Sequence, residues 1–357
     1  MSSKAYMQAI CQLEISTLVR YTFGMAMAAV GGKESKQIPR LWANGALLGV
    51  ALIWGSTFVL IKDIIEQVSP LLFLAARFAV GGLALALIIT FMRRWRGFSM
   101  REFWWGSLIG VALWAGYALQ TIGLQDTTAS NAGFITSLYV VIVPVLGLFI
   151  LKQKPDRWAW LGVLAAIVGL AMLILNFEEG VRINQGDPIV LGCSVAFALH
   201  VVLVARVAPW CDILRVTMVQ IIMAGLLNAV TAIIFERPVQ GLSGEIWGGV
   251  VFLGLAATAL AIVIQMSVQR FTTAVNTVLI LSLEPVFAAI FGVWLQNDRL
   301  GPIALIGGVL ILCGMLIAEI GSQLRSIILS RLRTQAATNL LIRADKPRTD
   351  IPPSDVS

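Results

Sequence analysis

Charged residues are scarce in this sequence. Aspartate, glutamate, lysine and arginine together make up 13% of the 357 residues, whereas hydrophobic residues make up 58%. A water-soluble domain has too little polar surface to cover so large an apolar share, but a lipid bilayer solvates apolar side chains directly. The composition therefore indicates a membrane protein.

Residue types that bind metals or catalyse reactions are also few. There is one histidine, and the four cysteines (Cys11, Cys193, Cys211 and Cys313) show neither metal-site spacing nor a disulfide framework. One histidine and scattered acids give no metal cluster. The sequence also lacks a GxxxxGK[ST] loop that would hold the phosphates of ATP. We therefore expect no catalytic residues, no metal and no cofactor.

Ten apolar stretches fill most of the chain, each close to the length of about 20 residues that a membrane-spanning helix needs. Inside lipid, every backbone group must be bonded within its own segment, so long apolar runs predict helices. We expect an all-α membrane protein with ten transmembrane helices. The expected spans are 43–63, 70–92, 103–124, 127–151, 158–176, 188–206, 213–235, 246–267, 273–296 and 302–320.

The positions of the basic residues predict the orientation. Of the 26 lysine and arginine residues, 21 fall on the side of the membrane that holds the N-terminus, four fall on the other side, and Arg77 lies within a span. Because cytoplasmic loops are enriched in these residues, we expect both termini in the cytoplasm and a multi-pass protein of the inner or plasma membrane. The net charge of +7 then reflects topology and contact with anionic lipid, not nucleic-acid binding.

Two segments lie outside the expected spans. Residues 1–42 are expected to form a cytoplasmic N-terminal segment, with Met25 or Met27 as an alternative start. Residues 321–357 form a basic cytoplasmic tail that mixes arginine with isoleucine and leucine, a pattern typical of an interfacial helix followed by disorder.

The two halves of the chain repeat each other. Residues 127–131 read TTASN and residues 272–276 read TTAVN, at an offset of 145. Five spans per half is an odd number, so the halves 43–176 and 186–320 must cross the membrane in opposite directions. Inverted repeats of this kind form a site near mid-membrane in transporters. Further matches at the same offset are Gln120 with Gln265, Ser137-Leu138 with Ser282-Leu283, Gly162 with Gly307 and Gly169 with Gly314.

Particular motifs add to this pattern: Trp54-Gly55-Ser56, Arg77, Ser282-Leu283-Glu284-Pro285-Val286 and the glycines of 302–320. Together they resemble the EamA-type branch of the drug/metabolite transporter superfamily, over roughly residues 43–320. The resemblance implies a small-molecule carrier built from two inverted five-helix repeats. It also implies that the first, third, fourth, sixth, eighth and ninth spans line a central cavity and that the second span packs outside it.

Glu284 is the foremost candidate for the site. A charged side chain at the centre of a span costs ~2.5–3.5 kcal/mol, so it tends to face the interior of the bundle. Pro285 follows directly and frees a backbone carbonyl one turn back. The carboxylate could bind a proton or a cationic group of a substrate. The alternative is a structural acid paired with a buried base.

Two further pairs of candidates follow from the repeat. Asn276 and Glu284 lie eight residues apart, on one stripe of a continuous helix, and Asn131 and Tyr139 are their equivalents in the first half. A selective site needs different side chains at equivalent positions of the two halves, and Glu284 and Tyr139 differ in this way. As the alternative, the two asparagines tie neighbouring helices together.

The third span offers an aromatic face with an amide. Trp114, Tyr117 and Gln120 recur at helical spacing, a combination suited to a metabolite with polar and apolar parts, and Gln265 is the repeat partner of Gln120. The alternative is packing between helices.

The sole histidine lies deep in the sixth span. In the repeat alignment His200 overlays Thr57 and Phe197 overlays Trp54, so Trp54 and Thr57 join the candidate site. A histidine that titrates near neutrality could relay protons, whereas the alternative is a neutral core residue. Arg77 is expected to extend outward toward the acids after the first span, with an anion-binding role as the lesser alternative.

These features predict a carrier that exports a small metabolite or drug-like compound by alternating access, driven by a proton gradient or by the substrate gradient. Its partners would be a small-molecule substrate, protons and the lipid bilayer, and no oligomeric state is indicated. Two alternatives from other classes are an intramembrane enzyme acting on lipids and a non-transporting membrane scaffold. The first needs a nucleophile or acid–base pair near the interface, and the second depends on the short basic tail.

Overall fold

The computed structural model describes residues 40–127, 129–174, 184–236, 243–296, 301–303, 305–318 and 320–321. Throughout these residues the regular structure is helical, without strands. Eight helical segments are long and apolar enough to cross a membrane, and two shorter apolar helices, Arg157–Met172 and Leu305–Ala318, accompany them. The prediction of an all-α membrane protein is confirmed. Ten crossings with inverted halves remain a prediction. Most of the expected N-terminal segment and tail lies outside the described residues.

The helices begin and end within a few residues of the expected spans. In chain order they are α3 (Arg40–Ile65), α4 (Pro70–Phe91), α5 (Met100–Gln125), α6 (Ala129–Ser137), α7 (Tyr139–Ile150), α8 (Arg157–Ile174), α9 (Asp187–Val207), α10 (Ile213–Phe235), α11 (Gly244–Phe252), the π-helix η1 (Leu253–Leu260), α12 (Ala261–Gln269), α13 (Ala274–Leu281) and α14 (Glu284–Gln296).

Polar side chains at the helix ends fix where the helices start. Ser99 and Glu102 form a capping box at α5: the Glu102 amide donates to Ser99 Oγ at 3.1 Å, and the Ser99 amide donates to Glu102 Oε2 at 3.1 Å. Thr273 caps α13 by accepting from the Asn276 amide at 3.1 Å. Each cap satisfies backbone donors that a helix start would otherwise leave free.

Two long apolar segments are interrupted at positions that the repeat makes equivalent. Between α6 and α7 the Leu138 amide donates to the Ile135 carbonyl at 3.1 Å, and between α13 and α14 the Leu283 amide donates to the Ile280 carbonyl at 3.2 Å. Both are tight i to i−3 turns in place of the α-helical i to i−4 pattern. The repeated Ser-Leu pairs of the sequence therefore mark the two places where the α-helical hydrogen-bond pattern of a spanning segment is interrupted.

The break before α14 corrects one expectation. Asn276 and Glu284 were expected on one stripe of a continuous helix, but α13 ends at Leu281 and α14 begins at Glu284. Pro285 has no amide hydrogen to donate into the preceding turn, so the ladder stops there. Glu284 therefore lies in the first turn of a new helix and does not share one continuous helix with Asn276.

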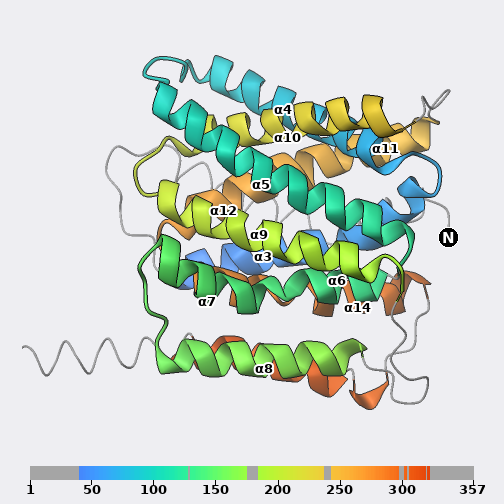
Figure 1. Ribbon diagram of the computed structural model, residues 1–357, viewed down its shortest axis with the longest axis vertical. Helices are drawn as coiled ribbons and strands as arrows, with labels where there is room; N and C mark the ends of the chain where they lie inside the picture. Colours follow the sequence, from blue (N-terminus) through green and yellow to red (C-terminus); the bar gives the residue numbers. More distant parts are fainter. Residues whose placement is uncertain are drawn as a thin grey trace, which may run out of the picture.

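The helices lie side by side in a row that runs from α4 and α10 at one end to α8 at the other (Figure 1). Helix α4 packs against α10 and η1, α5 against α9 and α10, and α14 against α3. At the α8 end, a Cβ added to Gly162 would lie 2.6 Å from the Gly314 carbonyl oxygen, and one added to Gly169 would lie 2.6 Å from the Gly307 carbonyl oxygen. Only glycine permits backbones at that separation.

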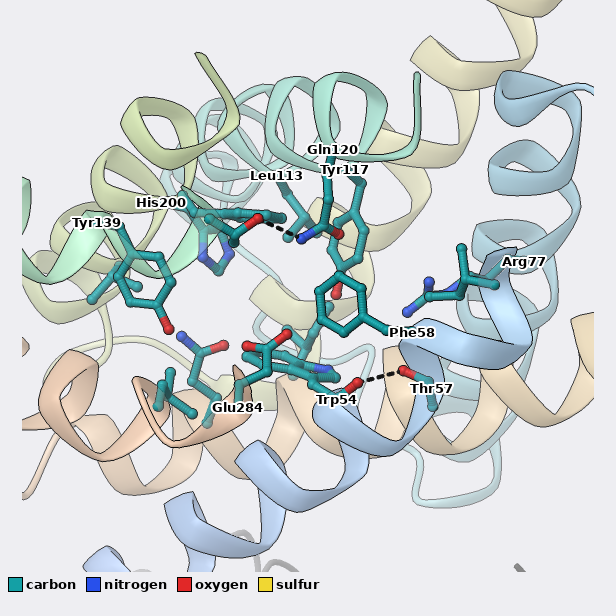
Figure 2. Close-up of a pocket in the computed structure, with 17 residues that line it drawn as sticks. Trp54, Thr57, Phe58, Arg77, Leu113, Tyr117, Gln120, Tyr139, His200 and Glu284 are labelled. Carbon is teal, nitrogen blue, oxygen red and sulfur yellow. Dashed lines mark hydrogen bonds between the residues drawn. The ribbon is translucent and has the colours of Figure 1, made fainter. Parts of the chain in front are cut away.

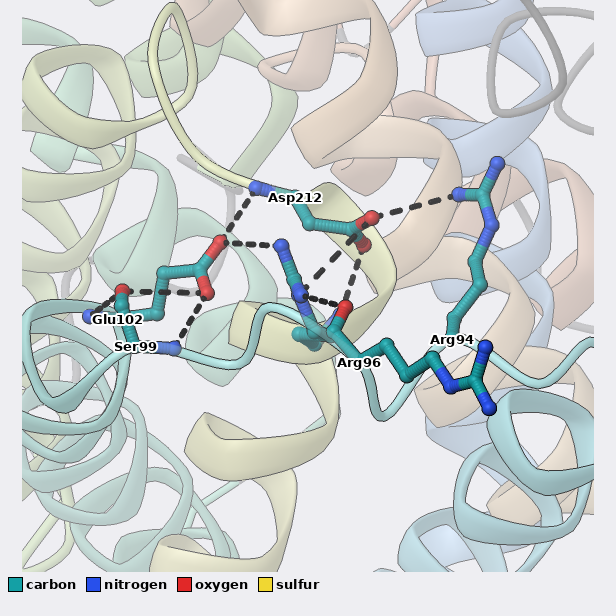
Figure 3. A network of polar contacts seen from close by, with 6 residues as sticks. Arg94, Arg96, Ser99, Glu102 and Asp212 are labelled. Atoms are coloured by element: carbon teal, nitrogen blue, oxygen red, sulfur yellow. Dashed lines mark hydrogen bonds and ion pairs between the residues drawn. The ribbon is translucent and has the colours of Figure 1, made fainter.

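Charged residues between α4 and α5 and at the start of α10 form a connected set, which we call the loop network (Figure 3). Arg215 Nη2 donates to Glu102 Oε1 at 3.1 Å, Arg94 Nη1 donates to Asp212 Oδ2 at 3.4 Å, and the Asp212 amide donates to Glu102 Oε1 at 2.8 Å. Arg215 Nη1 also donates to the Arg96 carbonyl at 3.1 Å. The loop network joins the end of the α4–α5 pair to the start of α10.

Candidate functional site

A cavity lies among the central helices, and the unfilled space in and around it is about 590 Å³ when open solvent and the crevices between side chains are counted. Side chains from nearly every central helix line it, and most of its lining is apolar (Figure 2). The lining residues are Trp54, Thr57, Phe58, Ile61, Arg77, Leu113, Tyr117, Gln120, Thr136, Tyr139, Phe197, His200, Val201, Ile262, Gln265, Leu281 and Glu284. Eight of the eleven residues predicted for the site are among them.

Helix α3 contributes Trp54 and Thr57. The indole Nε1 of Trp54 donates to the Ala257 carbonyl of η1 at 2.8 Å, and Thr57 Oγ1 donates to the Trp54 carbonyl at 2.8 Å. A π-helix has a wider turn than an α-helix and is frequent at functional sites. The η1 turn thereby fixes the Trp54 ring against the cavity.

Tyr117 and Gln120 of α5 face the cavity as predicted. The Tyr117 ring meets the rings of Phe197 and Phe78 edge to face, with centroid separations of 5.2 and 5.3 Å. Gln120 Nε2 donates to Thr136 Oγ1 at 3.1 Å. The aromatic rings hold one another in place through their quadrupoles, so this side of the cavity is preformed.

His200 of α9 lines the cavity and is 3% exposed. Its Nε2 lies 2.9 Å from Oε1 of Gln220, a fully buried residue of α10. Because an amide oxygen only accepts, Nε2 carries the proton in this contact and Nδ1 is left as an acceptor. The imidazole is therefore held in one tautomer by a neighbouring helix.

Glu284 faces the cavity from α14, and Tyr139 faces it from α7 (Figure 2). The two side chains belong to residues 7% and 4% exposed, respectively. No hydrogen bond or ion pair links the Glu284 carboxylate to any residue that the structure describes. A Cβ added to Gly55 of α3 would lie 2.5 Å from the Glu284 carbonyl oxygen and 2.7 Å from the Phe287 Cβ, so this glycine allows α14 to approach α3.

Arg77 requires a correction, because it was expected to extend outward from a span outside the cavity. Instead it is 1% exposed and lines the cavity from α4. Its Nε donates to Thr258 Oγ1 at 2.7 Å and its Nη2 to the Ala257 carbonyl at 3.5 Å, while its guanidinium carbon lies 4.9 Å from the centre of the Tyr117 ring. The acceptors on η1 direct the side chain inward, and Gly254 lets α4 approach η1 closely enough for these contacts.

Two other predicted residues, Gln265 and Trp114, lie in different places. Gln265 of α12 lines the cavity, and its Oε1 is buried without a hydrogen-bond partner. Trp114 lies outside the cavity and packs against Leu71, Ala118 and Ala232.

Asn276 lies apart from the cavity. Asn276 lines a separate hollow beside the α7–α8 connection, where its Nδ2 donates to Asn44 Oδ1 at 3.2 Å and to Thr272 Oγ1 at 2.9 Å. This contact matches the alternative that the asparagine ties helices together. The side chain of Asn131 lies outside the part of the chain that the structure describes.

Some lining residues were not among the predicted ones. Arg77 carried a signal, since an intramembrane charge is by default a candidate functional residue. Thr136 is a polar residue inside an expected span, but nothing in the sequence places it beside Gln120. Phe58, Leu113 and Ile262 carry no such signal, because an apolar residue in an apolar helix reads the same whether it faces lipid, core or cavity. Within the described residues, no three or more His, Cys, Asp or Glu side chains come together to hold a metal ion.

A helical, lipid-embedded chain around a cavity with polar and charged side chains defines a multi-pass membrane transporter. Several known proteins are similar over most of their length. An uncharacterized transporter of Archaeoglobus fulgidus is 32% identical over 311 residues, which cover 87% of this chain and 93% of that protein. The uncharacterized inner membrane transporter YedA of Escherichia coli is 24% identical over 78% of this chain and 91% of its own length.

The family assignment follows from a match to both halves. The sequence model of the EamA-like transporter family matches residues 41–175 and again residues 184–319. The chain belongs to the EamA-like transporter family. A solved crystal structure with 20% identity has the same fold, with a TM-score of 0.67 over 78% of this chain and 98% of the other.

Proposed function

We propose that this protein exports a small metabolite or drug-like compound by alternating access, and that it does so without catalysing a covalent reaction. In this proposal ten spans form two inverted five-helix halves, 43–176 and 186–320, in the inner or plasma membrane with both termini in the cytoplasm. The cavity between the halves would open to one side of the membrane and then to the other as the halves rock.

The observation that carries the proposal is the origin of the cavity lining. Trp54, Tyr117 and Tyr139 come from the first half of the chain, and His200, Gln265 and Glu284 come from the second. A cavity between two halves can change access when one half moves against the other, whereas a cavity within one half cannot. The equivalent helix breaks before α7 and α14 support the same arrangement, because broken helices beside a site are typical of transporters.

Proton coupling is the second part of the proposal, with Glu284 and His200 as carriers. A buried carboxylate without a partner is costly in its charged form, so protonation offsets that cost and substrate or water entry reverses it. The other titratable groups that line the cavity are Arg77, Tyr117 and Tyr139. Protonation of Glu284 would thus change the balance of charge in a cavity that also holds a fixed cation.

The test is flux through purified protein in liposomes, measured across a series of pH values with and without a pH gradient. Glu284→Gln should remove the dependence of flux on the pH gradient, because glutamine keeps the shape of the side chain but cannot titrate. Glu245→Gln is the matched control, since Glu245 is exposed in the first turn of α11, away from the cavity. An unchanged pH profile in the Glu284 variant would disprove the coupling.

A further inference from the structure

The hollow beside the α7–α8 connection, which we call the side hollow, is a site of its own. The unfilled space in and around it is about 990 Å³ when open solvent is counted. It shares no lining residue with the central cavity, so the transport function proposed above does not account for it. The lining residues are Pro144, Gly147, Leu151, Gln153, Lys154, Pro155, Asp156, Ala159, Thr273, Ala274, Val275, Asn276, Leu279 and Ala318.

The side hollow is polar at one end and apolar along its walls. Gln153, Lys154 and Thr273 belong to the chain connections at the helix ends. Pro144 lies six residues before the last residue of α7, and Leu279 lies five residues after the first residue of α13. At a rise of 1.5 Å per residue, the apolar walls extend about 8–9 Å along the helices. A polar rim at the helix ends above apolar walls fits a molecule that has a polar head and an apolar chain.

The end of α7 places Lys154 at this rim. Lys152 has a φ of 54°, in the left-handed region, and the Gln153 amide donates to the Gly147 carbonyl at 3.3 Å. This turn closes the last carbonyls of α7 in the manner of a Schellman motif and sends the chain across the hollow. Lys154 is exposed, and no hydrogen bond or ion pair joins its ammonium to a residue that the structure describes. The rim therefore presents an unpaired cation.

The charge around the rim is mainly positive. Lys152 and Arg157 are exposed on either side of Lys154 in the chain. The acid in the lining is Asp156, whose Oδ1 accepts from the Ala159 amide at 2.8 Å at the start of α8. Its negative charge is thus partly compensated by a helix N-terminus. Basic side chains directly beside membrane-spanning helices attract anionic lipid head groups. The rim complements such a head group.

We propose that the side hollow binds one anionic phospholipid, with the phosphate beside Lys154 and the first part of an acyl chain between α7 and α13. Leu148 and Phe149, which follow the lining residue Gly147, are 37% and 76% exposed, so the lipid-facing surface of α7 adjoins the hollow. A free phosphate ion would leave the apolar walls without contacts. The basic tail, residues 322–357, has the same sign of charge as the rim and does not complement it.

The first experiment measures lipid binding to the purified full-length protein in detergent by native mass spectrometry. The probes are dioleoyl phosphatidylglycerol and dioleoyl phosphatidylcholine, which have the same acyl chains and differ in net charge. The first phosphatidylglycerol should bind about five-fold more tightly than the first phosphatidylcholine, as expected for one lysine beside the head group. Lys154→Gln should bring this ratio close to one. Arg96→Gln is the matched control and should keep the ratio, because Arg96 is exposed on the α4–α5 connection, outside the side hollow.

The second experiment fills the apolar part of the side hollow. A Cβ added to Gly147 would meet no atom within 4 Å, so Gly147→Leu places a side chain in the space of the acyl chain without a clash. The first phosphatidylglycerol should then bind no more tightly than the following ones. Gly248→Leu is the matched control, because Gly248 of α11 also has open space around it and lies outside the hollow. Each comparison is a ratio within one variant, so a lower folded fraction cancels.

Equal binding of the two lipids, a ratio that survives in Lys154→Gln, or an unchanged first site in Gly147→Leu would each overturn the inference. Displacement of the first phosphatidylglycerol by an equal concentration of inorganic phosphate would assign the hollow to a water-soluble anion. Tighter lipid binding after deletion of residues 322–357 would assign it to the tail, and loss of a dimer in Gly147→Leu would assign it to a second copy of the chain. These measurements involve no flux, so their failure leaves the transport function standing.

Discussion

The loop network and the cavity use the same kinds of charged residue in opposite ways. In the loop network Arg215 and Arg94 each face a carboxylate: Arg215 lies 3.1 Å from Glu102, and Arg94 lies 3.4 Å from Asp212. In the cavity, Arg77 and Glu284 lie in one chamber without an ion pair. The charged side chains that join the α4–α5 connection to α10 are therefore paired. Unpaired charges buried in the cavity destabilise the protein unless a ligand or a proton neutralises them.

The strongest test of this difference replaces one arginine of each region with a neutral residue. Arg77→Met should lower flux in liposomes about ten-fold or more, because it removes a buried charged hydrogen-bonding group from the lining of the proposed transport cavity. Arg94→Met should change flux less than two-fold, since a partly exposed ion pair contributes only about 0–1 kcal/mol. Equal losses in the two variants would mean that the cavity charge has no special role.

The same comparison predicts opposite effects on stability for two glutamates. Glu102→Gln removes the charge that faces Arg215 and weakens the cap of α5, so it should lower the free energy of unfolding by about 1–3 kcal/mol. Glu284→Gln removes a charge without a protein partner, so the melting temperature should stay the same or rise. Thermal unfolding in detergent measures both. A large destabilisation by Glu284→Gln would show that this carboxylate is a structural partner.

The smallest expected effect concerns Asn276. Its contacts with Asn44 and Thr272 join helix ends, and such contacts between helices in membranes average about 0.6 kcal/mol. Asn276→Ala should therefore lower the melting temperature slightly and change flux less than two-fold. If Asn276→Ala lowered flux as much as Arg77→Met, Asn276 would have to contact the substrate, and its placement in a separate hollow would be contradicted.

Several features could be predicted from the sequence because they depend on local or additive properties. Apolar length alone placed the helices to within a few residues, since every backbone group in lipid must be bonded within its own helix. The close contact of Gly162 with Gly314 depends on residue size, because only glycine leaves room for a backbone there. Gln120, Tyr117 and Glu284 were found because polar groups in a span avoid lipid.

The remaining features depended on neighbours that the sequence does not reveal. Arg77 turns inward because Thr258 Oγ1 and the Ala257 carbonyl, both in the π-helix η1, lie within reach of it. Hydropathy gives no indication of a π-helix, since its residues are as apolar as those of the α-helices beside it.

The sequence by itself determined that this chain is a helical membrane protein with a repeated pattern and a few polar residues inside its spans. Hydrophobicity and residue size are properties of single residues, so they can be read one position at a time. Only the tertiary structure decided which polar residues share a cavity and which charges stay unpaired, because a side chain's partners depend on the rotation and separation of helices distant in the chain. For this reason the structure places Trp114 and Asn276 outside the cavity and Arg77 in its lining.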